Sequence, residues 1–185
     1  MAYAAGLPRA WLIAALAALV AVALTVEVGR ARSERARAHF TRYTGALLRA
    51  HEHRTLSGAT WMLGAYLAAA VIYPRPFAIA AMWAVGVGDA SAALVGRWWS
   101  ERRRPREAAA SAALAGAKTY AGTLACCVAA LVGARWVAGL ALAPALLTGV
   151  LAALAERPRA PLDDNLRIVL AVGVVALLAS LGVLG

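Results

Sequence analysis

The 185-residue chain is too apolar for an ordinary soluble domain, since 63% of its residues are hydrophobic, only 15% are charged and its mean hydropathy is +0.70. It is also strongly basic, with a formal net charge of +10. The basic residues flank apolar segments and are not interleaved with stacking aromatic residues, as a surface that binds nucleic acid would require. The composition therefore predicts an integral membrane protein with anionic lipid headgroups, and no nucleic acid, among its partners.

Six apolar segments follow one another along the chain, and each approaches the roughly 20 residues that a helical membrane crossing takes. They cover residues 10–29, 58–73, 77–97, 113–134, 136–156 and 168–184. The second and third segments should form a tight hairpin, because Pro74-Arg75-Pro76 leaves almost no room for a loop. We therefore expect an all-α fold, in which residues 1–185 form a single transmembrane domain built as a bundle of about six helices.

The arginines indicate how this bundle is oriented, because cytoplasmic loops retain positive charge during insertion. Every second connection is rich in arginine, with seven in residues 30–57, five in 97–106 and three in 157–167. The other connections and the N-terminus hold only Arg9, Arg75 and Arg135. This alternation predicts that both termini are extracytoplasmic and that the three basic loops are cytoplasmic. The segment 30–57 is expected to lie at the cytoplasmic interface as an amphipathic helix.

Asp89 is the first candidate site residue. It follows Gly86 and Gly88 and lies about two helical turns, or roughly 12 Å, inside the third segment from its cytoplasmic end. A carboxylate at that depth costs about 2.5–3.5 kcal/mol unless it is paired, hydrated or bound to a cation. Asp89 is therefore interpreted either as a metal ligand or as a protonated group in an interhelical hydrogen bond. The two small glycines before it would let the helix break or a ligand approach.

Lys118 is the only lysine in the chain, and hydroxyl and glycine residues surround it in Lys118-Thr119-Tyr120-Ala121-Gly122-Thr123. A lysine at the end of a membrane helix commonly extends its ammonium group to the lipid headgroups. Small residues and hydroxyls also permit the close approach of phosphate oxygens, and a lysine supplies a compact positive charge. The segment is not a P-loop, because it lacks the G-x-x-x-x-G-K-[ST] spacing.

Asp163 and Asp164 precede the last apolar segment and are followed by Asn165. Two adjacent carboxylates repel each other unless a cation neutralises them, and Mg²⁺ commonly binds one or two carboxylates together with substrate phosphates. The same residues are also typical N-caps of a helix. Metal binding and capping both remain open for this loop, and the two roles are compatible.

These motifs, taken in order, resemble the polyprenol kinase family, which includes dolichol kinase, phytol kinase and CTP-dependent diacylglycerol kinase and is related to CDP-diacylglycerol synthase. The resemblance covers about residues 27–184. It rests on Gly88-Asp89-Ala90 through Gly96-Arg97, Lys118-Thr119-x-x-Gly122-Thr123, Glu156 followed by Asp163-Asp164-Asn165-Leu166, and, upstream, Leu48-Arg49-Ala50-His51-Glu52 with Ser57-Gly58-Ala59.

The resemblance implies a membrane enzyme that uses CTP and Mg²⁺ to phosphorylate a lipid alcohol at the cytoplasmic leaflet. In this interpretation Asp89, Lys118 and Asp164 are catalytic, and Asp89, Asp163 and Asp164 hold the metal. The nucleotide would contact Arg97, Lys118, Thr119, Gly122, Thr123 and Asn165. The implied partners are CTP, the lipid alcohol and membrane lipid, with a second copy of the chain as an open alternative.

The sequence departs from the family pattern at three places. Ala121 occupies the position of a motif glutamate, Ser100 and Glu101 replace a Gly-Lys pair, and the early Arg-Lys-x-x-His element is not intact. Glu52, between His51 and His53, is either a further site residue or a solvated charge of the cytoplasmic loop. A cytidylyltransferase that makes a CDP-lipid, and a membrane protein without catalytic activity, are the two alternatives to the kinase.

Overall fold

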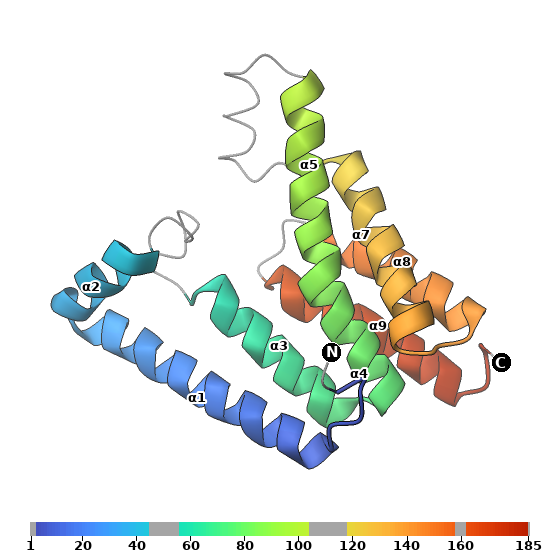
Figure 1. Cartoon of the computed structure of the whole chain (residues 1–185), viewed down its shortest axis with the longest axis horizontal. Helices are drawn as coiled ribbons and strands as arrows, with labels where there is room; N and C mark the ends of the chain where they lie inside the picture. Colours follow the sequence, from blue (N-terminus) through green and yellow to red (C-terminus); the bar gives the residue numbers. More distant parts are fainter. Residues whose placement is uncertain (1–2, 45–55, 104–117, 158–161, 185) are drawn as a thin grey trace.

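The computed structural model describes residues 3–44, 56–103, 118–157 and 162–184, and the regular elements in these ranges are all helical (Figure 1). In chain order they are α1 (Arg9–Arg32), α2 (Glu34–Thr44), α3 (Gly58–Ile72), α4 (Arg75–Trp83), η3 (Ala84–Gly88), α5 (Asp89–Arg103), α7 (Tyr120–Val132), η4 (Gly133–Val137), α8 (Leu142–Glu156) and α9 (Asp164–Ser180). The elements η3 and η4 are turns of π-helix that continue the α-helix before them. The predicted all-α class is confirmed for the described residues.

In the part of the chain that the structure describes, three helices are long and apolar enough to cross a membrane, judged by length and composition. They are Arg9–Arg32, the continuous helix Arg75–Arg103 formed by α4, η3 and α5, and Tyr120–Val137 formed by α7 and η4. Gly58–Ile72 and Leu142–Glu156 are shorter apolar helices, each about 22 Å long at 1.5 Å per residue. The described helices therefore include three of the length of a full crossing, and the predicted bundle of six crossings is not confirmed.

The boundary between the fourth and fifth predicted segments lies later than the sequence indicated. The π-helical turn η4 carries α7 through Trp136, and the chain then turns at Gly139, whose φ of 73° is a left-handed conformation that favours glycine. Helix α8 consequently begins at Leu142 and not near residue 136. The first residues of the predicted segment 113–134 lie outside the described residues.

Local sequence determines where several helices begin. A side-chain oxygen accepts a backbone N–H bond from the first turn at Ser57 in α3, Thr119 in α7 and Asp163 in α9. Helix α4 begins directly after Pro74 and packs against α3. The predicted tight hairpin between these two helices is thus confirmed.

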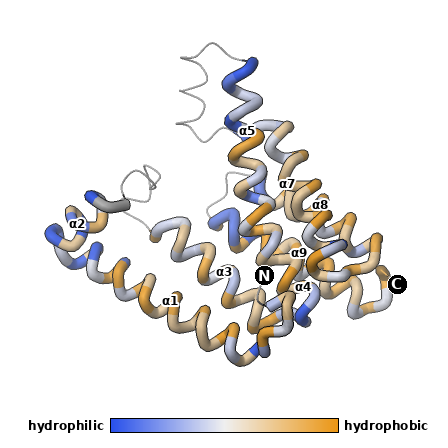
Figure 2. Tube along the Cα trace, viewed as in Figure 1, coloured by the Kyte–Doolittle hydropathy of each residue, from blue (hydrophilic) through white to orange (hydrophobic). Residues whose placement is uncertain are grey.

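The interior is built largely from small side chains. Many of its buried residues are alanines, and the largest fully enclosed side chains, Ile168, Val169, Val172 and Val175, all come from α9. A Cβ atom on Gly122 of α7 would lie only 2.6 Å from the carbonyl oxygen of Ala92 in α5. Such close backbone approach is typical of helices packed in lipid, where apolar burial provides little driving force between helices. Figure 2 shows hydrophilic residues at α2, at the far end of α5 and at the start of α9, whereas the helix middles are mostly apolar.

A buried polar network fastens the end of α1 to the start of α3. The Oε1 atom of Glu27 accepts hydrogen bonds from the backbone N–H of Ser57 at 3.0 Å and from the hydroxyl of Thr60 at 3.1 Å. Its Oε2 atom pairs with Nη1 of Arg30 at 2.6 Å. The Arg30 guanidinium also lies 4.2 Å from the ring centroid of Phe40 in α2. One carboxylate therefore joins the ends of three consecutive helices.

The opposite end of α1 has its own polar contacts. Arg9 donates from Nε to the carbonyl oxygen of Ala70 in α3 at 2.8 Å. Arg75 donates from Nη2 to the carbonyl oxygen of Tyr3 at 2.6 Å, and its guanidinium lies 5.1 Å from the centroid of that tyrosine ring. Helix α1 is thus attached at both ends.

Trp83 of α4 is wedged against the π-helical turn of α7. Its Nε1 atom donates to the carbonyl oxygen of Ala129 at 2.9 Å, and its indole ring fills the space that a side chain on Gly133 would occupy. Gly133 is therefore required for this contact because any Cβ atom at that position would overlap the ring.

The substitution Gly133→Ala should lower the free energy of unfolding in detergent by about 1–3 kcal/mol, because the indole must move and its hydrogen bond is lost. Gly64→Ala is the matched control, since no atom lies within 4 Å of a Cβ built there. In a Trp83→Ala background the same Gly133→Ala change should have little further effect. An equal loss of unfolding free energy in both backgrounds would contradict the proposed contact between Trp83 and Gly133.

Candidate active site

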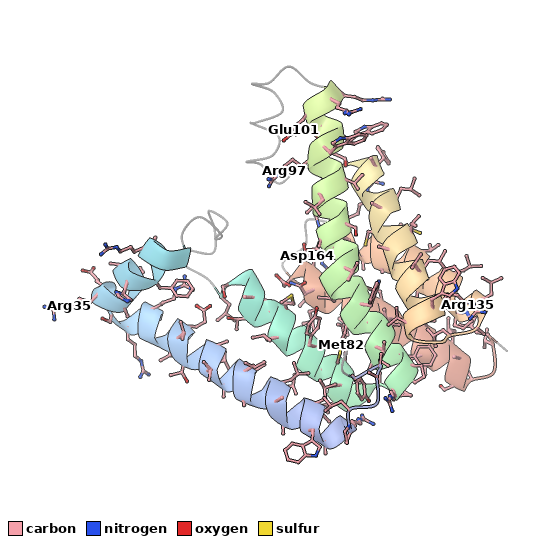
Figure 3. The ribbon with its side chains drawn as sticks, in the orientation of Figure 1. Arg35, Met82, Arg97, Glu101, Arg135 and Asp164 are labelled. Atoms are coloured by element: carbon pink, nitrogen blue, oxygen red, sulfur yellow. The ribbon has the colours of Figure 1, made fainter. Side chains whose placement is uncertain are left out.

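Three helix ends meet at the ammonium group of Lys118. Lys118 lies just before α7, Glu156 is the last residue of α8 and Asp164 is the first residue of α9. The Nζ atom lies 2.6 Å from Oε1 of Glu156 and 3.2 Å from Oδ2 of Asp164, and it also donates to the backbone carbonyl of Glu156. Figure 3 shows Asp164 within the bundle, where α9 begins. Three oxygen atoms therefore converge on one cationic group.

The helix ends favour this charge arrangement. Asp164 lies in the first turn of α9, where the helix dipole stabilises an anion, and the Lys118 ammonium lies at the carbonyl end of α8, where the dipole stabilises a cation. Glu156 is 4% exposed and Asp164 is 9% exposed, whereas the lysine side chain keeps 25% of its surface accessible. Two enclosed carboxylates thus share one partly accessible ammonium, which leaves this trio a formal charge of −1 when all three groups are ionised.

Asp89 lies at the junction between the π-helical turn η3 and α5. It directly follows Gly88, the residue through which this helix approaches Cys126 of α7. A Cβ atom on Gly88 would lie 3.4 Å from the Cys126 sulfur, so α5 and α7 approach closely at this level. The helix widens at the glycines and does not break. Single π-helical turns of this kind are frequent at functional sites.

Asp163 and Asn165 form a cap that fixes the start of α9. The Oδ1 atom of Asp163 accepts from the backbone N–H of Asn165 at 3.0 Å and from its side-chain Nδ2 at 2.8 Å. This confirms the capping interpretation for Asp163. Capping leaves Asp164 at the first helical position, from which its carboxylate reaches Lys118.

The remaining residues of the lysine motif also shape a helix start. Thr119 accepts from the backbone N–H of Gly122 at 3.0 Å, and the Thr123 hydroxyl donates to the carbonyl of Thr119 at 3.1 Å. Gly96 of α5 packs against the Thr119 hydroxyl, which would lie 3.1 Å from a Cβ atom there. Arg97, the next residue, is exposed, and Figure 3 shows it extending from α5 apart from Asp164. The described contacts therefore bring the threonines close to Lys118 and leave Arg97 on the surface.

His51, Glu52 and His53 lie outside the described residues, as do Leu48, Arg49 and Ala50 of the upstream motif. The structure thus provides no placement for Glu52 relative to the Lys118 trio.

Two residues of this region were not among the site residues predicted from the sequence. Glu156 appears in the motif series, but its spacing alone did not identify it as a ligand of Lys118. Arg167 follows Asp164 by three residues and therefore lies on the same side of α9. Its Nε and Nη1 atoms are enclosed and have no hydrogen-bond partner among the described residues. No local signal distinguished Arg167 from the other arginines of the basic connection 157–167.

An apolar cavity of about 310 Å³ opens between α1, α3 and the α4–η3 helix. Leu12 and Leu16 line it from α1, Tyr66 from α3 and Met82 from α4. Gly86 and Val87 of η3 complete this wall. Asp89 follows Gly86 by three residues, or about one helical turn, along the same helix. One helix thus carries both part of an apolar cavity and a carboxylate of the candidate site.

Among the described residues, no group of three or more His, Cys, Asp or Glu side chains is arranged to hold a metal ion. Glu156 and Asp164 direct carboxylate oxygens to the Lys118 ammonium, which occupies the point where they converge. Two carboxylates are nevertheless the kind of donors to which Mg²⁺ binds. Mg²⁺ usually binds one or two carboxylates together with substrate phosphates and water, and not an all-protein cage.

Comparison with known proteins identifies no relative: no family model, no curated protein and no solved structure matches the chain.

Replacing Lys118 by methionine should lower the free energy of unfolding by about 1–3 kcal/mol, between the values for exposed and buried ion pairs, because two enclosed carboxylates lose their common cation. Thermal or chemical unfolding in detergent measures the effect. Arg135→Met, at an exposed arginine on the π-helical turn η4, is the control and should have little effect. A Lys118→Met protein as stable as the wild type would show that the trio does not hold the helix ends together.

Proposed function

We propose that the chain is a membrane lipid kinase that transfers the γ-phosphate of CTP to a lipid alcohol such as a polyprenol, phytol or diacylglycerol. The observation that carries this proposal is the meeting of Lys118, Glu156 and Asp164. Lys118 is separated from these residues by 38 and 46 positions in the chain, respectively, yet contacts both. These are motif positions on which the resemblance to the polyprenol kinase family rests.

In the proposed topology six helices cross the membrane, both termini are extracytoplasmic and the Lys118 trio faces the cytoplasm. The distribution of arginines along the chain supports this arrangement. The trio lies at helix ends that adjoin basic connections, and Arg157, directly after α8, lies 4.0 Å from the ring centroid of Tyr120 at the start of α7. In this topology CTP, a cytoplasmic metabolite, reaches the site without crossing the membrane.

Glu156 and Asp164 would hold Mg²⁺ beside the Lys118 ammonium, and Asp89 stays among the metal ligands that the resemblance implies. When bound, the ion supplies neutralisation of the negative charge on the nucleotide phosphates. Asp163 caps α9 through Oδ1, a role compatible with the metal binding implied for it. Glu156 is added to the proposed donor set because its carboxylate contacts Lys118.

Lys118 is proposed to act on the transferred phosphoryl group. Its ammonium is held between two carboxylates and keeps a quarter of its surface accessible. A cation at this position stabilises the negative charge on the phosphoryl oxygens as the transfer proceeds. The threonine-rich helix start beside it leaves room for a phosphate because its side chains are small.

In the proposed reaction the lipid hydroxyl oxygen attacks the γ-phosphorus, a new P–O bond forms, and the bond to the β,γ-bridging oxygen breaks, so that CDP leaves. The hydroxyl proton passes to a carboxylate, for which Asp89 is the proposed acceptor. Its position one turn from the cavity wall at Gly86 supports this assignment. The apolar cavity would hold the chain of the lipid, and its size is within the range of small-molecule sites.

The decisive experiment supplies purified protein with Mg²⁺, candidate lipid alcohols and phosphatidate, and CTP labelled at either the α- or the γ-phosphorus. We expect label from the γ position to appear in the lipid alcohol. Label from the α position in phosphatidate would instead identify a cytidylyltransferase. Absence of both products would contradict the enzyme proposal and favour a non-catalytic membrane protein.

The substitution Asp89→Asn should reduce kcat about 10²- to 10⁴-fold, the usual contribution of a general base. It should leave the yield of folded protein and the melting temperature nearly unchanged, because the amide keeps the shape of the side chain. Glu101→Gln, at an exposed carboxylate on the same helix, is the control and should retain activity. Loss of folded Asp89→Asn protein in parallel with activity would identify Asp89 as a packing residue.

A further inference from the structure

Arg167 has two guanidinium-group nitrogens that no described residue satisfies. Its Nε and Nη1 atoms are enclosed and make no hydrogen bond to any described residue, although the residue as a whole is only partly buried. The described ion pairs do not include it, and Asp164, three residues earlier on α9, is paired with Lys118.

Enclosing N–H donors without acceptors is unfavourable, because the lost hydrogen bonds to water are not replaced. The location of Arg167 adds to this, since it lies on the first turns of α9, where the backbone N–H of Arg167 bonds to the carbonyl of Asp163 at 3.1 Å. An uncompensated donor group thus lies in a fixed part of the helix, one turn from the candidate site.

We propose that Arg167 binds the oxygens of a phosphoryl group that enters the site. This inference rests on the proposed function and adds a binding residue to it. A guanidinium presents several N–H donors in a planar arrangement that matches phosphate oxygens, and such charge-assisted bonds are among the strong ones. A phosphoryl group offers acceptor oxygens to both enclosed nitrogens, whereas a cationic ligand would be repelled.

Arg167 and Lys118 would then both bind oxygens of the phosphoryl group, with Asp164 as a neighbour of each along the chain or in space. Asp164 contacts Lys118 directly and lies three residues before Arg167 on the same side of α9. In this arrangement Asp164 pairs with Lys118, and a phosphoryl group would bring both cations a new partner. The phosphoryl group belongs either to a nucleotide or to a lipid headgroup, and both sources offer the same chemistry to the arginine.

The test measures binding and not turnover. Full-length protein in nanodiscs of phosphatidylcholine is titrated with pyrophosphate and with CTP, and its melting temperature is followed; a parallel series replaces part of the phosphatidylcholine with phosphatidate. The variants are Arg167→Met, which removes the donors, Arg167→Lys, which keeps the charge, and Arg135→Met as the exposed control.

We expect pyrophosphate, CTP or phosphatidate to stabilise the wild type and the Arg135→Met control. Arg167→Met should bind that ligand about 10- to 100-fold more weakly, and Arg167→Lys should fall between the two. Without ligand, Arg167→Met should be at least as stable as the wild type, because two enclosed donors without acceptors are gone. Stabilisation by soluble phosphates identifies a nucleotide subsite, and stabilisation by phosphatidate alone identifies a headgroup subsite; either supports the proposal.

The proposal is overturned if Arg167→Met binds these phosphates as tightly as the wild type, or if no phosphate stabilises the wild type. It is also overturned if the ligand-free variant is markedly less stable, since Arg167 would then already have a structural partner. Its failure is distinguishable from failure of the kinase proposal. Labelled phosphate could reach the lipid in Arg167→Met with an unchanged KM for CTP, and phosphate could bind through Arg167 in a protein that transfers no label.

Discussion

The contact of one ammonium group with oxygens from two other helix ends determines the arrangement of this part of the bundle. Lys118 precedes α7, Glu156 ends α8 and Asp164 begins α9, so their contacts fix the relative positions of three successive helices. In lipid, apolar side chains gain little by leaving the membrane for a neighbouring helix, and polar contacts at helix ends are correspondingly important. The same contacts concentrate charge at one place, so structural and chemical roles coincide in these three residues.

Close backbone packing makes this concentration of charge possible. Gly122 lets α7 approach the carbonyl of Ala92, and Gly88 lets α5 approach Cys126. The Lys118 motif and the Asp89 helix thereby become neighbours, although no side-chain ion pair between them is needed. The π-helical turn η3 shifts the register of α5 relative to α4 at the point where Asp89 begins the new helix. Small residues thus bring the helix that carries Asp89 against the helix that follows Lys118.

Much of this arrangement could be predicted from the sequence, and the reasons for the rest are physical. Apolar length and proline position predicted the helices and the α3–α4 hairpin, since both depend on local chain chemistry. Lys118 and Asp164 could be predicted as site residues from their residue types and their sequence neighbours. The partner role of Glu156 and the enclosure of Arg167 depend on how α8 and α9 pack, which no local pattern encodes. The extension of α7 through Trp136 depends on a π-helical turn stabilised against Trp83, a contact between residues far apart in the chain.

The two fastenings of α1 have a consequence for access from the surrounding lipid. The helix is held by the Glu27 network at one end and by Arg9 at the other, while its middle portion presents mainly apolar side chains. A hydrocarbon chain could therefore enter laterally between the middle of α1 and the neighbouring helices while the hydrogen bonds at both ends of α1 remain formed. A lipid would then exchange with the bilayer without any helix dissociating, and the rate of that exchange would depend on side-chain rearrangement alone.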